Sequence, residues 1–246
     1  MYEPPLAFAH RGGANVPENL GIENSLVAFR NAHDLGYRYF ETDVRASRDG
    51  VVYACHDETL ERLTGRKDHI AAVDSAKIDA QLLGEREPMS RLADLLTAFP
   101  DTCFNIDVKS DDVVTPTIAV IRELEAVERV CLASFNHRRL VTLRNEAPEL
   151  LTSASTAEAA RLRLRLMPSR APQFYQVPVR HHGVDLVTPS FINRAHRAGQ
   201  QVHVWTIDDP AQMHRLLDMG VDGLMTDRTD LLKEVLVKRG QWKDPA

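Results

Sequence analysis

Two carboxylates two positions apart, Glu41 and Asp43, follow the aromatic run at residues 37–40. Alternate side chains of a strand point to the same side, so both carboxylates project from one face. Carboxylates held that close repel each other, and a divalent cation between them relieves the repulsion. A polar strand end without chemistry is the structural alternative. The pair therefore indicates a metal site if other reactive side chains gather beside it.

Histidines end two further apolar runs. His10 follows residues 6–9 and precedes Arg11, and His56 follows residues 51–55. An imidazole titrates near neutral pH, which suits it to donate or accept a proton in a reaction. Each histidine taken alone is more simply explained as a core or turn residue. Beside a carboxylate pair, the two histidines together indicate acid–base chemistry.

Composition narrows the class of protein. The chain has 246 residues, of which 43% are hydrophobic, and a net charge of −5. Without a basic footprint we expect no nucleic-acid partner. No stretch reaches the length of a membrane span, and the first five residues do not resemble a signal peptide. Cys55, Cys103 and Cys131 lie far apart in apolar runs. Such spacing is typical of reduced thiols, so we expect a cytoplasmic protein.

Short apolar runs alternate with helical patterns along the chain. The expected strands cover residues 6–9, 38–44, 103–108, 129–133, 150–154, 174–177, 202–206 and 223–226. Residues 184–187 are expected to share one strand position of the barrel with residues 174–177. The expected helices cover residues 26–35, 91–99, 116–125, 137–146, 157–166, 193–197, 210–219 and 230–238. Eight strand positions, each followed by a helix, predict an α/β protein with one (β/α)8 TIM barrel domain over residues 1–246. A doubly wound sheet is the alternative, but its Gly-x-Gly-x-x-Gly turn is missing.

One stretch interrupts this alternation after the second strand. Residues 58–90 are charged and weakly periodic, which predicts a small insertion or lid within the domain. Residues 51–55 form a further short strand, either inside the barrel or as a hairpin beside it.

Polar residues at the ends of barrel strands face the catalytic mouth. Those that end or follow the expected strands are His10, Arg11, Glu41, Asp43, His56, Asp107, Lys109, Ser134, Trp205 and Thr206. Burying so many charges without partners is costly, so their convergence indicates function and not structure. For Lys109 the sequence names no structural partner.

At these residues the chain resembles the glycerophosphodiester phosphodiesterases. The resemblance spans nearly the whole chain and is carried by His10-Arg11-Gly12, Pro17-Glu18-Asn19, Glu41-Thr42-Asp43-Val44, Asp49-Gly50, His56-Asp57 with Leu60-Glu61-Arg62-Leu63-Thr64, Asn105-Ile106-Asp107-Val108-Lys109, Trp205-Thr206, Gly220-Val221-Asp222-Gly223 and Thr226-Asp227. The most specific part is the block from His10 to Thr64.

The resemblance implies a barrel enzyme that hydrolyses glycerophosphodiesters to glycerol 3-phosphate and an alcohol. It implies one divalent cation on Glu41, Asp43 and Asp107, and oxygen ligands of this kind suit Mg²⁺ or Ca²⁺. The remaining residues would act on a small-molecule substrate. By resemblance, the acid–base pair is His10 and His56, and the substrate-binding residues are Arg11, Lys109 and Trp205.

Three departures from the family pattern concern Asp107, residues 20–22 and Asp208. The family usually has Glu where this chain has Asp107, so that carboxylate reaches one methylene less far. Leu20-Gly21-Ile22 separates Pro17-Glu18-Asn19 from the following helix. Asp208 stands where Asn is common, and the sequence gives no reason for it.

Other functions fit parts of the pattern. A zinc amidohydrolase on this barrel needs His-x-His after the first strand, which is absent. A lysophospholipase D, or an enzyme that cleaves phosphoinositides or sphingolipids, differs mainly in substrate. A non-catalytic barrel predicts ligand affinity without turnover. Attack by water and attack by the glycerol 2-hydroxyl, which gives a cyclic phosphate, are both open.

Overall fold

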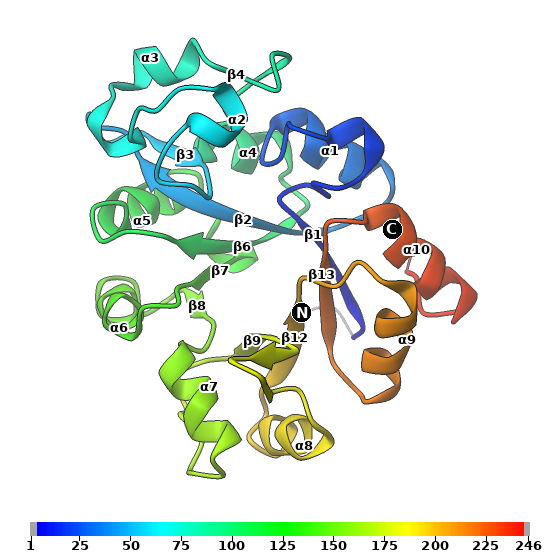
Figure 1. Ribbon diagram of the computed structural model, residues 1–246. Helices are drawn as coiled ribbons and strands as arrows, with labels where there is room; N and C mark the ends of the chain where they lie inside the picture. Colours follow the sequence, from blue (N-terminus) through cyan, green and yellow to red (C-terminus); the bar gives the residue numbers. More distant parts are fainter. Residues whose placement is uncertain (1–3, 244–246) are drawn as a thin grey trace.

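Eight parallel strands form the centre of the computed structural model, which describes residues 4–243. They are β1 (Leu6–His10), β2 (Tyr39–Ala46), β6 (Cys103–Val108), β7 (Val130–Ala133), β8 (Leu151–Thr152), β9 (Phe174–Pro178), β12 (Gln201–Trp205) and β13 (Gly223–Thr226). Hydrogen bonding runs in the order β8-β7-β6-β2-β1-β13-β12-β9. A parallel bridge between Ser153 and Phe174 joins the two ends of that order. The strands therefore form a nearly closed barrel (Figure 1).

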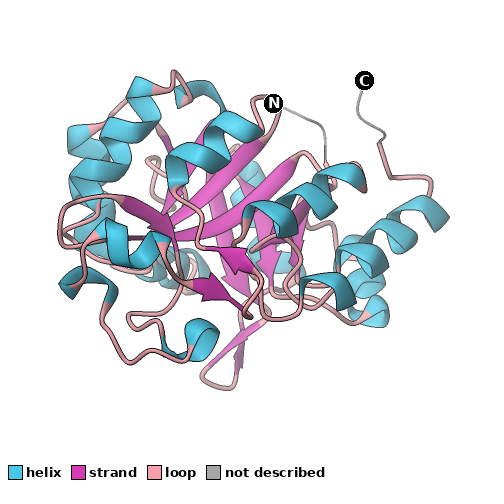
Figure 2. Ribbon diagram, turned by 90° about the horizontal axis from the view of Figure 1, so that it is seen from above, coloured by secondary structure: helices cyan, strands magenta, loops and turns pink. Residues whose placement is uncertain are grey.

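Helices surround the strands (Figure 2). They are α1 (Leu26–Asp34), α4 (Leu92–Ala98), α5 (Val114–Glu123), α6 (His137–Glu146), α7 (Thr156–Arg163), α8 (Pro189–Arg197), α9 (Pro210–Asp218) and α10 (Thr229–Lys238). Short 3-10 turns cover Pro17–Asn19 (η1), Ile70–Ala72 (η2) and Val127–Arg129 (η3). The predicted (β/α)8 barrel is confirmed. None of the helices in the described range is long and apolar enough to cross a membrane.

Side chains alternate along each barrel strand, so that one set packs in the core beneath the helices and the other set faces the site. Phe40 on β2 and Phe104 on β6 point outward, and their rings meet edge to face with centroids 5.5 Å apart beneath the helices. The side chains that alternate with them, Glu41 and Asp43 on β2 and Asn105 and Asp107 on β6, line the cavity inside the barrel. Because β2 and β6 are parallel, the register places Glu41 beside Asn105 and Asp43 beside Asp107. The fold therefore lines up three carboxylates on two neighbouring strands.

The predicted insertion follows β2 and lies at one edge of the barrel, far from α7 and α8 (Figure 1). β3 (Val52–Ala54) pairs antiparallel with β2, so residues 51–55 belong to a hairpin beside the barrel. The insertion itself comprises α2 (Glu61–Thr64), α3 (Ser75–Asp79), β4 (Leu82–Leu83) and β5 (Glu87–Pro88). It has its own buried cluster, which includes Tyr53, Ile70 and Ile78.

The prediction for residues 184–187 is wrong. In the structure β11 (Val184–Asp185) pairs antiparallel with β10 (Arg180–His181) in an exposed hairpin outside the barrel. His182 and Gly183 both have positive φ, 46° and 79°, which turns the chain back on itself. Helix α8 also begins at Pro189, earlier than residue 193, because Thr188 caps it by accepting a hydrogen bond from the Phe191 amide.

Candidate active site

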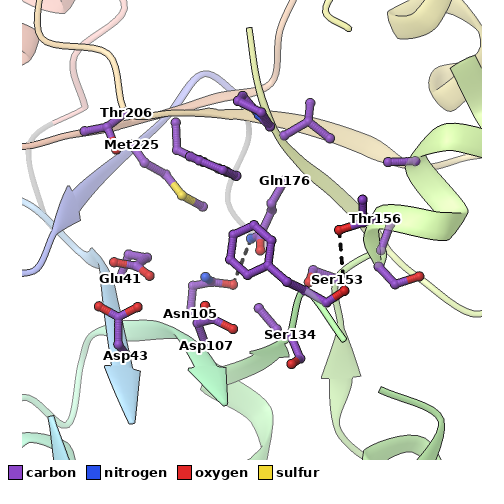
Figure 3. Close-up of a pocket in the computed structure, with 18 of the residues that line it drawn as sticks. Glu41, Asp43, Asn105, Asp107, Ser134, Ser153, Thr156, Gln176, Thr206 and Met225 are labelled. Carbon is purple, nitrogen blue, oxygen red and sulfur yellow. Dashed lines mark hydrogen bonds between the residues drawn. The ribbon is translucent and has the colours of Figure 1, made fainter. Parts of the chain in front are cut away.

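A cavity of about 290 Å³ opens at the mouth of the barrel. It is lined by every residue predicted for the site: His10, Arg11, Glu41, Asp43, His56, Asp107, Lys109 and Trp205. Figure 3 shows Glu41 and Asp43 on one strand, with Asn105 and Asp107 on the next. The structure thus brings residues 195 positions apart in sequence into one cavity, from His10 to Trp205.

The three carboxylates are nearly inaccessible to solvent. Glu41, Asp43 and Asp107 are 6%, 2% and 5% exposed. Burial, followed by the charge of Asp43, raises the pKa of Glu41 to about 7. Burial also raises the pKa of Asp107. Burial would raise the pKa of Asp43 too, but the charges of Lys109 and Arg11 hold it below its ordinary value. Without nearby positive charge, ionising all three carboxyl groups together is therefore unfavourable.

Lys109 does have partners, contrary to the sequence-based expectation. Its Nζ lies 2.6 Å from Asp43 Oδ1 and 2.7 Å from Asp107 Oδ2. The register of β2 and β6 brings those two carboxylates side by side, so one ammonium contacts both. Arg11 Nε lies 3.0 Å from Asp43 Oδ2. Both cations thus stand at the carboxylates and also line the cavity, where they can meet an anionic substrate.

His10 is held by an aspartate from the far end of the chain. Its Nδ1 lies 2.6 Å from Asp227 Oδ1, and its Nε2 lies 3.6 Å from Glu41 Oε2. Burial would lower the pKa of His10, but Glu41 and Asp227 raise it above its ordinary value. Asp208 accepts a hydrogen bond from the Asp227 amide at 2.8 Å. The unexplained Asp208 therefore anchors the residue that orients His10.

His56 has a similar partner next to it in sequence. Its Nδ1 lies 2.7 Å from Asp57 Oδ1. An ionised carboxylate only accepts hydrogen bonds, so the pairing assigns the proton to Nδ1 in both histidines. The other nitrogen, Nε2, is then available for proton transfer. Neither Asp227 nor Asp57 was assigned a role from the sequence.

A chain of ion pairs connects the two halves of the site through Glu23, which the sequence analysis missed. Arg62 on α2 donates from Nη1 and Nη2 to the Glu23 carboxylate at 2.7 and 2.8 Å, and from Nε to Asp57 at 2.6 Å. Glu23 also accepts from Arg11 Nη1 at 3.2 Å. Glu18, in the Pro17-Glu18-Asn19 motif that carries part of the family resemblance, is exposed. Glu23-Asn24-Ser25, directly before α1, supplies the carboxylate instead.

Replacing Arg62 with alanine tests this connection. Because Arg62 touches the partners of His56 and Arg11 but does not line the cavity, we expect kcat to fall about 10–100-fold, as for residues that orient catalytic groups. Arg66→Ala is the matched control, since Arg66 pairs with Asp68 in the same segment. Equal kcat values for both variants, measured with the same substrate, would contradict the assignment.

The three carboxylates supply oxygens of the kind that a divalent cation binds. Each has one buried oxygen that accepts no hydrogen bond: Glu41 Oε2, Asp43 Oδ2 and Asp107 Oδ1. Of these, Asp43 Oδ2 is ion-paired with Arg11 Nε at 3.0 Å, and Glu41 Oε2 lies 3.6 Å from His10 Nε2. Three anionic oxygens are a donor set for a hard cation such as Mg²⁺ or Ca²⁺. Within residues 4–243 no group of three ligating side chains already has metal-binding geometry. Lys109 lies between two of these carboxylates.

Glu41 and His10 predict a pH dependence of stability in metal-free protein. Folding raises the Glu41 pKa from 4.5 to about 7, so the proton it holds stabilises the fold at low pH and that stabilisation is lost as pH rises. The raised His10 pKa acts in the same direction. The lowered Asp43 pKa acts oppositely, but only at pH values near and below its ordinary 3.8.

We therefore expect the free energy of unfolding, measured by urea denaturation with a chelator, to fall between about pH 5 and pH 8. Glu41 alone contributes up to about 3 kcal/mol. Glu41→Gln should flatten the dependence. A free energy of unfolding that rises over this pH window would contradict the charge assignment.

Part of the cavity wall is apolar. Phe135 and Trp205 meet there edge to face, with ring centroids 5.5 Å apart. Val177, Pro178 and Leu186 continue the wall. The cavity therefore combines charged groups with apolar surface, and Lys109 Nζ lies 5.6 Å from the centroid of the Phe135 ring. This combination suits an anionic ester with a less polar leaving group.

A barrel whose mouth combines paired histidines, buried carboxylates and two cations defines an enzyme that acts on anionic esters. The chain matches the model of the glycerophosphoryl diester phosphodiesterase family over residues 10–231. This protein therefore belongs to the glycerophosphoryl diester phosphodiesterase family. It is an enzyme of the phosphodiester hydrolase class, and the sequence-based identification is confirmed.

Relatives agree with this membership. A Mycobacterium tuberculosis protein named probable glycerophosphodiester phosphodiesterase 2 is 41% identical, with 96% of this chain and 92% of the relative aligned. A glycerophosphodiester phosphodiesterase structure from Agrobacterium tumefaciens is 26% identical with a TM-score of 0.80, covering 94% of this chain and 99% of that one. An Oleispira antarctica phosphodiesterase, solved with its product sn-glycerol-3-phosphate, is 18% identical with a TM-score of 0.78, covering 95% and 97%.

Proposed function

We propose that this enzyme hydrolyses glycerophosphodiesters to glycerol 3-phosphate and an alcohol, with one divalent cation and two histidines. One observation carries the proposal: a single cavity is lined by two histidines, three buried carboxylates and two cations. The product found in the Oleispira antarctica phosphodiesterase supports the same chemistry. Three free thiols also accord with a cytoplasmic location.

The residues divide the work by charge. Arg11 and Lys109 would hold the phosphate and neutralise charge that develops on its oxygens. Glu41, Asp43 and Asp107 would hold Mg²⁺ or Ca²⁺, which when bound polarises the phosphoryl group. One imidazole Nε2 takes the proton of the attacking oxygen as the new P–O bond forms. The other histidine, as an imidazolium, gives its proton to the leaving alkoxide as the old P–O bond breaks. Attack by water gives glycerol 3-phosphate directly. Attack by the glycerol 2-hydroxyl gives a cyclic phosphate, which a water molecule then opens at the 2-oxygen with the two proton transfers reversed.

Product identity tests this function. The protein is incubated with glycerophosphocholine or glycerophosphoethanolamine and Mg²⁺ or Ca²⁺, and glycerol 3-phosphate is measured with a coupled dehydrogenase. We expect stoichiometric glycerol 3-phosphate and free alcohol. Binding of these diesters without turnover would identify a non-catalytic barrel instead. Phosphorus NMR during turnover distinguishes direct attack by water from a cyclic phosphate intermediate.

The apolar wall favours a second candidate, a lysophospholipase D activity. Phe135, Leu186 and Trp205 offer apolar surface against which an acyl chain can pack. A monoacyl substrate would place its chain along this wall. Comparing kcat/KM for lysophosphatidylcholine and glycerophosphocholine decides the matter. A higher value for lysophosphatidylcholine, lost in Phe135→Ser, would establish this second activity.

A further inference from the structure

One sector of the chain has the opposite charge to the rest. Residues 159–207 contain seven arginines and a single acidic residue, Asp185. The remaining chain carries 23 basic and 34 acidic residues. An acidic protein with one strongly basic sector presents that sector to an anionic partner.

The fold gathers part of this charge at one place. Arg163 and Arg165 near the end of α7, together with Arg194 on α8, line a second cavity of about 210 Å³. Helices α7 and α8 lie side by side (Figure 1). Arg163 and Arg194 donate to the backbone carbonyls of Asp185 and Leu166, at 3.0 and 2.6 Å. Carbonyls fix the guanidinium groups but do not neutralise them.

These positive charges lack acidic partners. In the part of the chain that the structure describes, no carboxylate pairs with Arg163, Arg165 or Arg194. The Asp185 carboxylate is already paired with Arg180 at 2.9 Å. The three arginines therefore present net positive charge to a ligand.

Apolar side chains are interleaved with the arginines on the same segment. Leu164 and Met167 are 71% and 77% exposed, and Leu166 and Val184 are also exposed. Leu164, Leu166, Met167, Val184, Arg163, Arg165 and Arg194 are called here the arginine–leucine surface. Leu164, Leu166 and Met167 lie within four residues of one another, and exposing large apolar side chains is unfavourable in water unless a partner covers them.

The arginine–leucine surface is continuous with the mouth of the active site. The β10–β11 hairpin carries Val184, and His181 from the same hairpin lines the catalytic cavity. Arg163 contacts the hairpin through the Asp185 carbonyl. The first residue of α7, Thr156, also lines the catalytic cavity. A partner bound at this surface would therefore lie next to the entrance.

The mixture of arginine and leucine favours lipid over nucleic acid. Single-stranded nucleic acid is bound by basic grooves with aromatic side chains for base stacking, and residues 161–172 contain no aromatic side chain. A bilayer accepts apolar side chains at its interface while the guanidinium groups remain at the phosphates. We propose that the arginine–leucine surface docks this protein on bilayers that contain anionic phospholipid.

Vesicle co-sedimentation tests the docking without any substrate. The full chain is mixed with vesicles of phosphatidylcholine alone or with about 30 mol% phosphatidylglycerol, at about 0.1 M and 0.5 M NaCl. We expect binding to the anionic vesicles that weakens at the higher salt concentration. Two double variants test the two kinds of side chain. The first combines Arg163→Ala and Arg165→Ala, and the second combines Leu164→Ser and Met167→Ser. Each double variant should weaken vesicle binding about tenfold or more.

The matched controls are Arg66→Ala and Val237→Ser, which alter an exposed arginine and an exposed valine outside the arginine–leucine surface. Both should bind as the wild type does, and thermal unfolding shows that each variant is folded. Equal binding to neutral and anionic vesicles, no binding, or tighter binding to single-stranded RNA than to vesicles would each overturn the proposal. Since no turnover is measured, failure of the docking is distinct from failure of the proposed hydrolysis.

Discussion

Replacing His10 or His56 with alanine is expected to lower kcat by about two to four orders of magnitude, the usual contribution of a general acid or base. Each imidazole is oriented by an aspartate, Asp227 or Asp57, bound at Nδ1. Loss of either ring removes one of the two proton transfers. Product release by each variant is measured at a saturating substrate concentration and compared with the wild-type enzyme.

Folding must be separated from chemistry in these variants. His10 is buried against Asp227 and Glu41, so His10→Gln accompanies His10→Ala and keeps a polar side chain in place. His33→Ala is the control, because His33 contacts Asp101 away from the cavity. Thermal unfolding checks that every variant is folded. Near-native kcat in a folded His56→Ala enzyme would remove His56 from the acid–base pair.

The barrel followed from the sequence because each strand is a short apolar run that ends in polar residues. That pattern shows which way each strand runs and which of its residues lie at the mouth of the barrel. All eight predicted site residues accordingly line one cavity. It failed at residues 184–187, where Val184 and Asp185 belong to an exposed hairpin. A run of four residues does not show which face it buries, and the turn at His182 and Gly183 decided its place.

The partners of the site side chains were harder to predict than the set of residues that lie at the mouth of the barrel. Asp227 lies 217 positions from His10, and only closure of the barrel brings them together. Glu23 and Glu18 occupy similar Glu-Asn contexts in one loop, and the sequence does not show which one turns inward. Lys109 gained its partners from the register between β2 and β6, which strand alternation alone does not specify.

Removal of divalent cations is expected to abolish turnover, and addition of Mg²⁺ or Ca²⁺ to restore it. Three buried carboxylate oxygens without hydrogen bonds provide the reason. Without an ion, burial and then the charge of Asp43 raise the Glu41 pKa, which disfavours the ionised form that a metal requires. The metal affinity should therefore increase as pH rises through about 7. Isothermal titration with each ion at several pH values measures this without activity.

Asp107 is the third carboxylate proposed to hold the ion. The register pairs Asp107 with Asp43 on parallel strands, so we expect its carboxylate to belong to the same donor set although it is one methylene shorter than glutamate. Asp107→Asn keeps the shape and removes the charge, and we expect the metal concentration for half-maximal activity to rise about 10–100-fold. Asp107→Glu should be tolerated, because it lengthens the reach and retains the charge.

Asp111→Asn is the matched control, since Asp111 is exposed and pairs with Arg139 outside the cavity. Full activity of chelator-treated, metal-free enzyme would remove the ion and the site assignment with it. If Asp107→Asn alone leaves the metal requirement unchanged, the ion is held by Glu41 and Asp43. The contact between Lys109 and Asp107 would then identify Asp107 as the residue that places the ammonium group at the phosphate.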